Sequence, residues 1–143
     1  AKAMGASNVI VVDLVEKRLE YAKKLGANHV INAKTEDVEA KIAELLGERG
    51  ADVVLETAGS PKTIYQTPFF AKRGGTVVLV GLAVDSTLQY NFSQVMNKEL
   101  TIKSVFRYRN LYPTAINAIA DGARKHQSGR TLNGRARDEL HPH

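Results

Sequence analysis

The sequence of 143 residues contains no cysteine, so neither disulfide bonds nor thiolate metal sites can form within it. It has no apolar run close to the roughly 20 residues that a membrane-spanning helix needs. Residues 1–8, AKAMGASN, also lack the apolar core of a signal peptide. We therefore expect a protein that does not associate with membranes, and the absence of cysteine fits the reducing cytoplasm.

The positive charge of the chain is unevenly distributed. The net charge is +5, and residues 123–143 alone hold five Lys or Arg but only two Asp or Glu. The first 122 residues carry a net charge of only +2, which does not favour a nucleic-acid surface. Because residues 123–143 are polar with little to bury, we expect one domain over 1–122 and a disordered basic tail over 123–143.

Segments typical of strands alternate with segments typical of helices along the first 122 residues. Apolar β-branched runs such as VIVV at 9–12 indicate strands covered on both faces, and apolar residues at helical spacing follow them. We expect Thr35 to cap the second helix and Pro68 to interrupt the third. The predicted strands lie near 8–13, 29–32, 51–59, 74–83 and 99–106, and the helices near 15–25, 36–46, 61–67, 92–98 and 112–123.

This alternation predicts parallel βαβ units in an open α/β sheet. Ligands of such sheets bind beyond the carboxyl ends of the strands. Small or polar residues occur at those predicted ends, namely Asp13, residues 57–59, Gly81 and Arg107. The sequence therefore predicts a nucleotide-binding sheet with these residues along one crevice.

The glycine-rich loop of dinucleotide folds is missing from the sequence. That loop precedes the ribose-binding acid by about 20 residues, and the same count back from Asp13 passes Ala1. We therefore predict a Rossmann-like, doubly wound, mainly parallel sheet that lacks its first strand and glycine loop. Because that strand is central in the sheet, we expect the chain alone to rearrange its sheet, to pair strand edges between copies, or to be marginally stable.

Four segments together resemble the medium-chain, zinc-dependent alcohol dehydrogenases, and the last of them resembles the sorbitol and polyol branch. They are residues 1–27, ETAGS at 56–60, GGTVVLVGL at 74–82, and KSVFRYRNLYPTAI at 103–116. The resemblance covers roughly residues 1–122. It implies the cofactor-binding part of an NAD-dependent enzyme that transfers hydride between a secondary alcohol or polyol and NAD.

The resemblance also implies roles for particular residues. Asp13 would bind the hydroxyls of the adenosine ribose and disfavour NADP, with capping of the following helix as the alternative. Arg18 would contact the same ribose or lie as a solvated helix residue. Two short stretches would line the nicotinamide. Arg107 and Tyr108 would also face the substrate, with a surface arginine–tyrosine pair as the alternative. The two stretches are Val80, Gly81 and Leu82, and Val105, Phe106 and Arg107.

The zinc of the resembled family is held by Cys, His and Glu in another domain. Without cysteine, this chain cannot build that site, and its four histidines show no spacing typical of zinc. We expect no metal and no catalytic residue in this chain, an inactive protein when it stands alone, and a homo-oligomeric parent enzyme.

Three other functions stay open on the sequence. The first is a zinc-free medium-chain reductase of the quinone reductase type, although Asp13 disfavours the NADPH that such enzymes often prefer. The second is a nucleotide-sensing or S-adenosylmethionine-binding module, in which an acid at the same strand end also holds ribose. The third is an interaction module whose basic tail binds acidic partners or RNA.

Overall fold

The structure is a computed structural model that describes residues 1–108 and 110–122. It forms two compact units, Ala1–Phe106 and the part of the chain from Arg107 onward. The predicted tail over 123–143 lies outside the described residues. No helix in the described ranges is long and apolar enough to cross a membrane.

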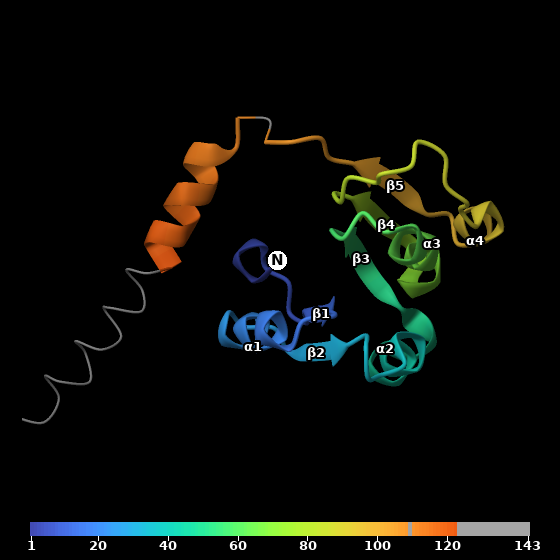
Figure 1. Ribbon diagram of the computed structural model, residues 1–143, viewed down its shortest axis with the longest axis horizontal. Helices are drawn as coiled ribbons and strands as arrows, with labels where there is room; N and C mark the ends of the chain where they lie inside the picture. Colours follow the sequence, from blue (N-terminus) through green and yellow to red (C-terminus); the bar gives the residue numbers. More distant parts are fainter. Residues whose placement is uncertain (109, 123–143) are drawn as a thin grey trace, which may run out of the picture. The chain divides into compact units, whose positions relative to one another are not determined.

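The first unit alternates strands and short helices as the sequence predicted (Figure 1). After the 3-10 turn η1 (Lys2–Met4), the chain forms β1 (Ile10–Asp13), α1 (Glu16–Lys24), β2 (His29–Asn32), α2 (Val38–Leu46) and the 3-10 turn η2 (Gly47–Arg49). It continues with β3 (Ala51–Glu56), α3 (Pro61–Phe70), β4 (Ala71–Leu79), α4 (Phe92–Asn97) and β5 (Thr101–Ser104). The described part of the second unit holds a helix over residues 112–122, which confirms the predicted last helix.

The five strands of the first unit form two parallel sheets. One sheet pairs β1 with β2, and the other has the order β3-β4-β5. These orders match the strands that lie on the two sides of the central strand in a dinucleotide-binding sheet. The strands within each sheet keep this order, whereas rearrangement of the sheet, edge pairing between copies and marginal stability remain predictions.

Each sheet has its own small core. Around the first sheet, Leu19 of α1 and Ile31 of β2 are each only 1% exposed. In the second half, Ile64, Ala71 and Val77 are buried, and α3 packs against β3 and β4. The sequence predicted these elements because their apolar residues recur at the spacing of one buried helix or strand face.

The opposite face of the second sheet is less covered. Val54 and Val77 are register partners on one face, and Val77 is completely buried. Val53 and Leu55 lie on the other face of β3 and are 54% and 55% exposed. Since side chains of a strand alternate between faces, this difference shows that the first unit covers only one side of β3.

The helix α3 continues through Pro68, so the predicted interruption is wrong. A proline has no N–H, and the carbonyl of Ile64 four residues earlier loses its usual helical partner. The Thr67 hydroxyl donates a hydrogen bond to that carbonyl at 2.8 Å. Burial of the Pro68 ring then stabilises a helix that the missing bond alone would have weakened.

Several other boundaries also differ from the sequence prediction. The third strand ends at Glu56 rather than near 59, and the fifth spans Thr101–Ser104 rather than 99–106. Asp37, not Thr35, caps α2, because its carboxylate accepts a hydrogen bond from the Ala40 N–H at 3.1 Å. The fourth strand starts at Ala71 and ends at Leu79, earlier than predicted at both ends. Residues 80–82 are therefore not part of a strand, and they form a turn beyond its carboxyl end.

Candidate functional site

Asp13 ends β1 and lies at the carboxyl edge of the first sheet. One of its oxygens, Oδ1, accepts a hydrogen bond from the Val15 N–H at 2.9 Å. The other, Oδ2, lies 3.5 Å from an Arg18 guanidinium nitrogen. The Asp13 side chain keeps 25% of its surface exposed and that of Arg18 keeps 72%. Asp13 therefore binds the start of α1 and still has an accessible carboxylate.

The neighbouring strand end is also polar. Asn32 is the register partner of Asp13, and its Nδ2 donates to Glu16 Oε2 at 2.7 Å. The Asn32 N–H donates to Glu36 Oε2 at 2.8 Å. Both strands of the first sheet thus end in hydrogen-bonded polar groups rather than in apolar packing.

Two glycines bring the backbones beyond β3 and β4 into contact. A Cβ added to Gly81 would lie 2.1 Å from the nitrogen of Gly59, and one added to Gly59 would lie 2.5 Å from the carbonyl oxygen of Leu82. Gly59 also has a left-handed φ of 69°, which favours glycine. Neither position has space for a side chain, so the turn at 80–82 lies directly on the loop that follows β3.

The residues flanking these glycines are accessible. Val80 is 42% exposed and Leu82 is 80% exposed. The Val105 N–H donates to the carbonyl of Leu79 at 2.9 Å, which continues the ladder between β4 and β5. Val105 therefore lies beside the end of β4, and it and Phe106 keep 42% and 66% of their surface exposed. Residues 80–82 and the first two residues of the second predicted stretch, Val105 and Phe106, thus belong to adjacent strand ends.

Arg107 and Tyr108 belong to the second unit. Arg107 adopts a left-handed φ of 57°, which is uncommon for a residue with a side chain. The ring of Tyr108 lies 4.6 Å from that of Tyr112 at the start of the helix over 112–122. The predicted substrate contacts of both residues remain a prediction.

Glu56, the last residue of β3, was not among the predicted site residues. It is only 4% exposed and accepts hydrogen bonds from Ala58, Gly59 and Thr63. The available sequence signal was an acidic residue that ends an apolar strand and stands three positions before a glycine. The sequence prediction considered a strand-end acid only at Asp13, which is not followed by a glycine at that spacing.

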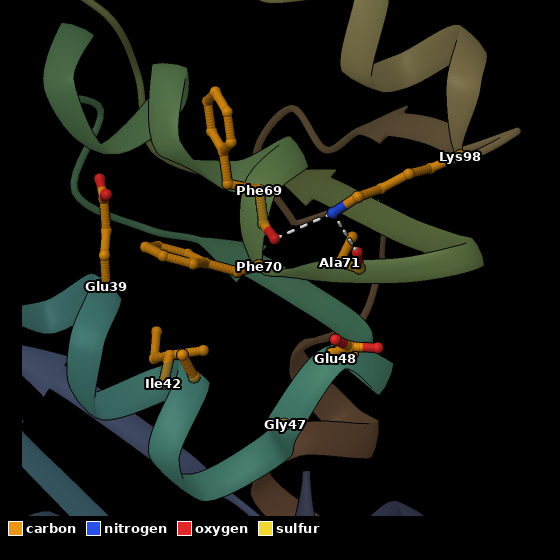
Figure 2. A pocket seen from close by; sticks show the side chains of 10 residues that line it. Glu39, Ile42, Gly47, Glu48, Phe69, Phe70, Ala71 and Lys98 are labelled. Atoms are coloured by element: carbon orange, nitrogen blue, oxygen red, sulfur yellow. Dashed lines mark hydrogen bonds between the residues drawn. The ribbon is translucent and has the colours of Figure 1, made fainter.

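A cavity of about 270 Å³ lies at the opposite, amino end of β3 and β4. Figure 2 shows Ile42, Phe69 and Phe70 around it, with Glu39 and Glu48 on the side of α2 and η2. Lys98 crosses toward Ala71, and its Nζ donates to the carbonyls of Pro68, Phe69 and Ala71 at 2.9, 3.0 and 2.9 Å.

Burial and the nearby charge of Arg73 lower the pKa of the Lys98 amine below its ordinary value of 10.5. The amine binds the carbonyls at the carboxyl end of α3, where a helix favours a cation. This cavity is therefore separate from the predicted cofactor site, and its lysine stabilises a helix end.

The described residues contain no group of three His, Cys, Asp or Glu side chains placed to hold a metal ion. Parallel strands joined by helices, with an accessible acid and a glycine contact at the strand ends, define an α/β fold of the Rossmann type. The chain belongs to the zinc-binding dehydrogenase family, whose sequence profile matches residues 1–121.

Relatives within this family are alcohol and polyol dehydrogenases. The chain is 46% identical over 121 residues to the uncharacterized zinc-type alcohol dehydrogenase-like protein YdjJ of Escherichia coli, covering 85% of this chain and 34% of that one. It is 40% identical over 122 residues to sorbitol dehydrogenase of Bacillus subtilis, covering 85% and 35%. The chain thus spans about a third of the length of these relatives.

Solved structures show the same fold. Benzyl alcohol dehydrogenase of Acinetobacter calcoaceticus matches with a TM-score of 0.75 and 35% identity, over 85% of this chain and 35% of that one. A putative zinc-binding dehydrogenase of Sinorhizobium meliloti bound to NADP matches with a TM-score of 0.74 and 26% identity, over 85% and 36%. An alcohol dehydrogenase of Escherichia coli complexed with NADH matches with a TM-score of 0.72 and 26% identity, over 82% and 34%. Relatives of this chain therefore bind NAD or NADP.

Proposed function

We propose that this chain is the cofactor-binding part of an NAD-dependent, zinc-type alcohol or polyol dehydrogenase. The observation that carries the proposal is the accessible carboxylate of Asp13 at the carboxyl end of β1, in a chain whose relatives bind dinucleotides. A carboxylate has about four acceptor positions, and Asp13 uses only part of them within the chain. The same group can therefore hold the Val15 N–H at the start of α1 and accept the two ribose hydroxyls.

The observed geometry fits the other half of the cofactor as well. The Gly59–Gly81 contact leaves the turn at 80–82 without a side chain at its centre, so a flat ring can approach its backbone closely. Val80, Leu82, Val105 and Phe106 supply accessible apolar surface beside it. NAD, when bound, would accept a hydride from the carbon of an alcohol.

The proposed substrate is a small secondary alcohol or polyol. Sorbitol dehydrogenases and D-xylulose reductases are among the relatives with 34% to 40% identity to this chain. Arg107 and Tyr108 would offer a guanidinium and a hydroxyl to such a substrate. Zinc belongs to the proposed whole enzyme, and the described residues of this chain supply no set of ligands for it.

The test is a fluorescence titration with NADH of two proteins. One is this chain, and the other carries upstream of Ala1 the corresponding segment of Bacillus subtilis sorbitol dehydrogenase, including its glycine loop. We expect strong binding by the extended protein, and weakening when Asp13 is changed to Ala. A folded extended protein that binds S-adenosylmethionine but not NADH would contradict the proposal.

A further inference from the structure

Glu56 is a buried carboxylate held by neutral donors. Its Oε1 accepts hydrogen bonds from the Ala58 N–H at 3.0 Å, the Gly59 N–H at 3.0 Å and the Thr63 hydroxyl at 2.7 Å. Its Oε2 shares the Gly59 N–H at 3.1 Å. Burying a carboxylate is costly unless hydrogen bonds replace its water. These bonds hold the loop after β3 closed around the side chain.

The main chain of Glu56 holds the turn beyond β4. Its carbonyl oxygen accepts hydrogen bonds from the N–H groups of Val80 at 2.8 Å and Gly81 at 2.9 Å. One residue therefore fixes two loops, the first through its carboxylate and the second through its carbonyl. The Gly59–Gly81 contact closes the arrangement, because neither backbone can shift without meeting the other.

The Glu56 charge lies directly behind the turn. A Cβ at Gly81 would be 2.7 Å from Oε2. Of the two carboxylate oxygens, Oε2 has the fewer bonds, namely the shared Gly59 N–H only. Its negative charge is thus incompletely compensated on the side that faces Gly81, in a site with little water to screen it.

We infer that Glu56 is a positioning residue of the dinucleotide site, which fixes the turn at 80–82 and, through its charge, favours the oxidised over the reduced cofactor. This inference rests on the proposed function for the location of the nicotinamide. The nicotinamide ring is positive in NAD⁺ and neutral in NADH. A fixed negative charge behind Gly81 therefore stabilises bound NAD⁺ more than bound NADH.

The positioning is tested on the 143-residue chain without cofactor. Amide hydrogen exchange is measured by NMR in the unmodified chain and in Glu56→Gln. A carboxamide would place an NH₂ group against the Gly59 N–H, so we expect exchange at Gly59 and Gly81 to accelerate roughly tenfold or more. Exchange in α1 and β2 should stay the same. Unchanged exchange at Gly59 and Gly81 would overturn the positioning role.

Two variants serve as controls. Glu48→Gln removes one charge from an exposed residue of η2, the turn that precedes β3, and it should leave exchange at both amides unchanged. Thr63→Val removes one donor to Glu56 but keeps the charge. If Glu56→Gln does not fold, Thr63→Val should still accelerate exchange at Gly59, and its failure to do so would overturn the role.

The charge effect is tested by titrating NAD⁺ and NADH into the protein that binds NADH in the fluorescence titration proposed above. We expect Glu56→Gln to weaken the binding of NAD⁺ roughly tenfold more than the binding of NADH. Thr63→Val and Glu48→Gln should leave the ratio of the dissociation constants for NAD⁺ and NADH unchanged. Equal weakening of both forms by Glu56→Gln would overturn the charge effect. Absence of NADH binding by the folded, unmodified extended protein would instead refute the proposed function, and hydrogen exchange would still decide the positioning role.

Discussion

Asp13 and Glu56 are both acidic residues that end a parallel strand, yet they lie in opposite environments. The Asp13 side chain is a quarter exposed and has a cationic neighbour in Arg18. Glu56 is 4% exposed and is surrounded by backbone N–H groups and a hydroxyl. One acid is therefore available to a ligand, whereas the other is committed to the protein's own loops.

The difference follows from what comes after each strand. After Asp13 the chain enters α1 within three residues, and the carboxylate stays at the helix start. After Glu56 the chain first makes a loop with a left-handed glycine before α3 begins at Pro61. That loop folds back over the Glu56 side chain and buries it. An acidic residue at the end of a strand thus indicates a ligand site only when the following loop leaves its carboxylate accessible.

The glycine contact behind Glu56 gives the largest predicted effect. Gly81→Ala would place a Cβ within 2.1 Å of the Gly59 nitrogen, so one backbone must move. We expect the half formed by β3, β4 and β5 to lose more than about 3 kcal/mol of unfolding free energy, measured by urea denaturation with circular dichroism. Gly122→Ala, which meets no atom within 4 Å, is the control. Equal unfolding free energies of the two variants would contradict a tight contact between the Gly59 and Gly81 backbones.

The second prediction compares the two acids directly. Glu56→Ala removes the acceptor of the buried Gly59 N–H and of the part-buried Ala58 N–H, while the Thr63 hydroxyl keeps its bond to the Ser60 carbonyl. We expect the change to cost about 2 to 3 kcal/mol. Asp13→Ala loses one hydrogen bond from the Val15 N–H and should cost about 1 kcal/mol. Urea midpoints of the two variants, measured side by side, test the ranking. A larger loss for Asp13→Ala would mean that Asp13 is the structural acid.

The third prediction concerns cofactor choice at the open acid. In the proposed site the Asp13 carboxylate would repel a 2′-phosphate, and Asp13→Ala removes that charge while leaving Arg18 in place. We expect the preference for NAD over NADP to fall roughly tenfold, measured by titration of both cofactors into the extended protein. Glu20→Gln, on the exposed surface of α1, should leave the preference unchanged. A preserved preference for NAD would argue against ribose binding by Asp13.

The smallest predicted effect is at the amino end of the second sheet. A hydrogen bond and the charge of Lys72 lower the pKa of the Asp52 carboxyl below its ordinary value of 3.8. Because the folded pKa is the lower one, the pair stabilises the chain above pH 3.8 and loses this effect as the pH falls through the folded pKa.

Asp52→Asn should therefore lower the urea midpoint slightly at neutral pH and not at the acid end. High salt should shrink the difference, since both side chains contact solvent. Asp85→Asn in an exposed loop is the control. A difference between wild type and Asp52→Asn that persists at the acid end would contradict an electrostatic origin.

Sequence patterns predicted the elements better than their ends. The apolar periodicity located every strand and helix of the first unit, since burial of one face is a local property of the sequence. The cap at Asp37 and the helix through Pro68 were missed, because each depends on one hydrogen bond to a particular neighbour. The resemblance implied cofactor contacts for Asp13 and Gly81, which remain predictions, and it implied no role for Glu56.

The sequence by itself determined the parallel α/β class, the acid at the end of β1 and the membership in a dehydrogenase family. These properties depend on short-range periodicity and on motifs that adjacent residues carry. Only the tertiary structure decided that the strands divide into two sheets, that Gly59 and Gly81 meet, and that Glu56 is buried between their loops. Those features join residues more than 20 positions apart, and the order of strands in space is what brings them together.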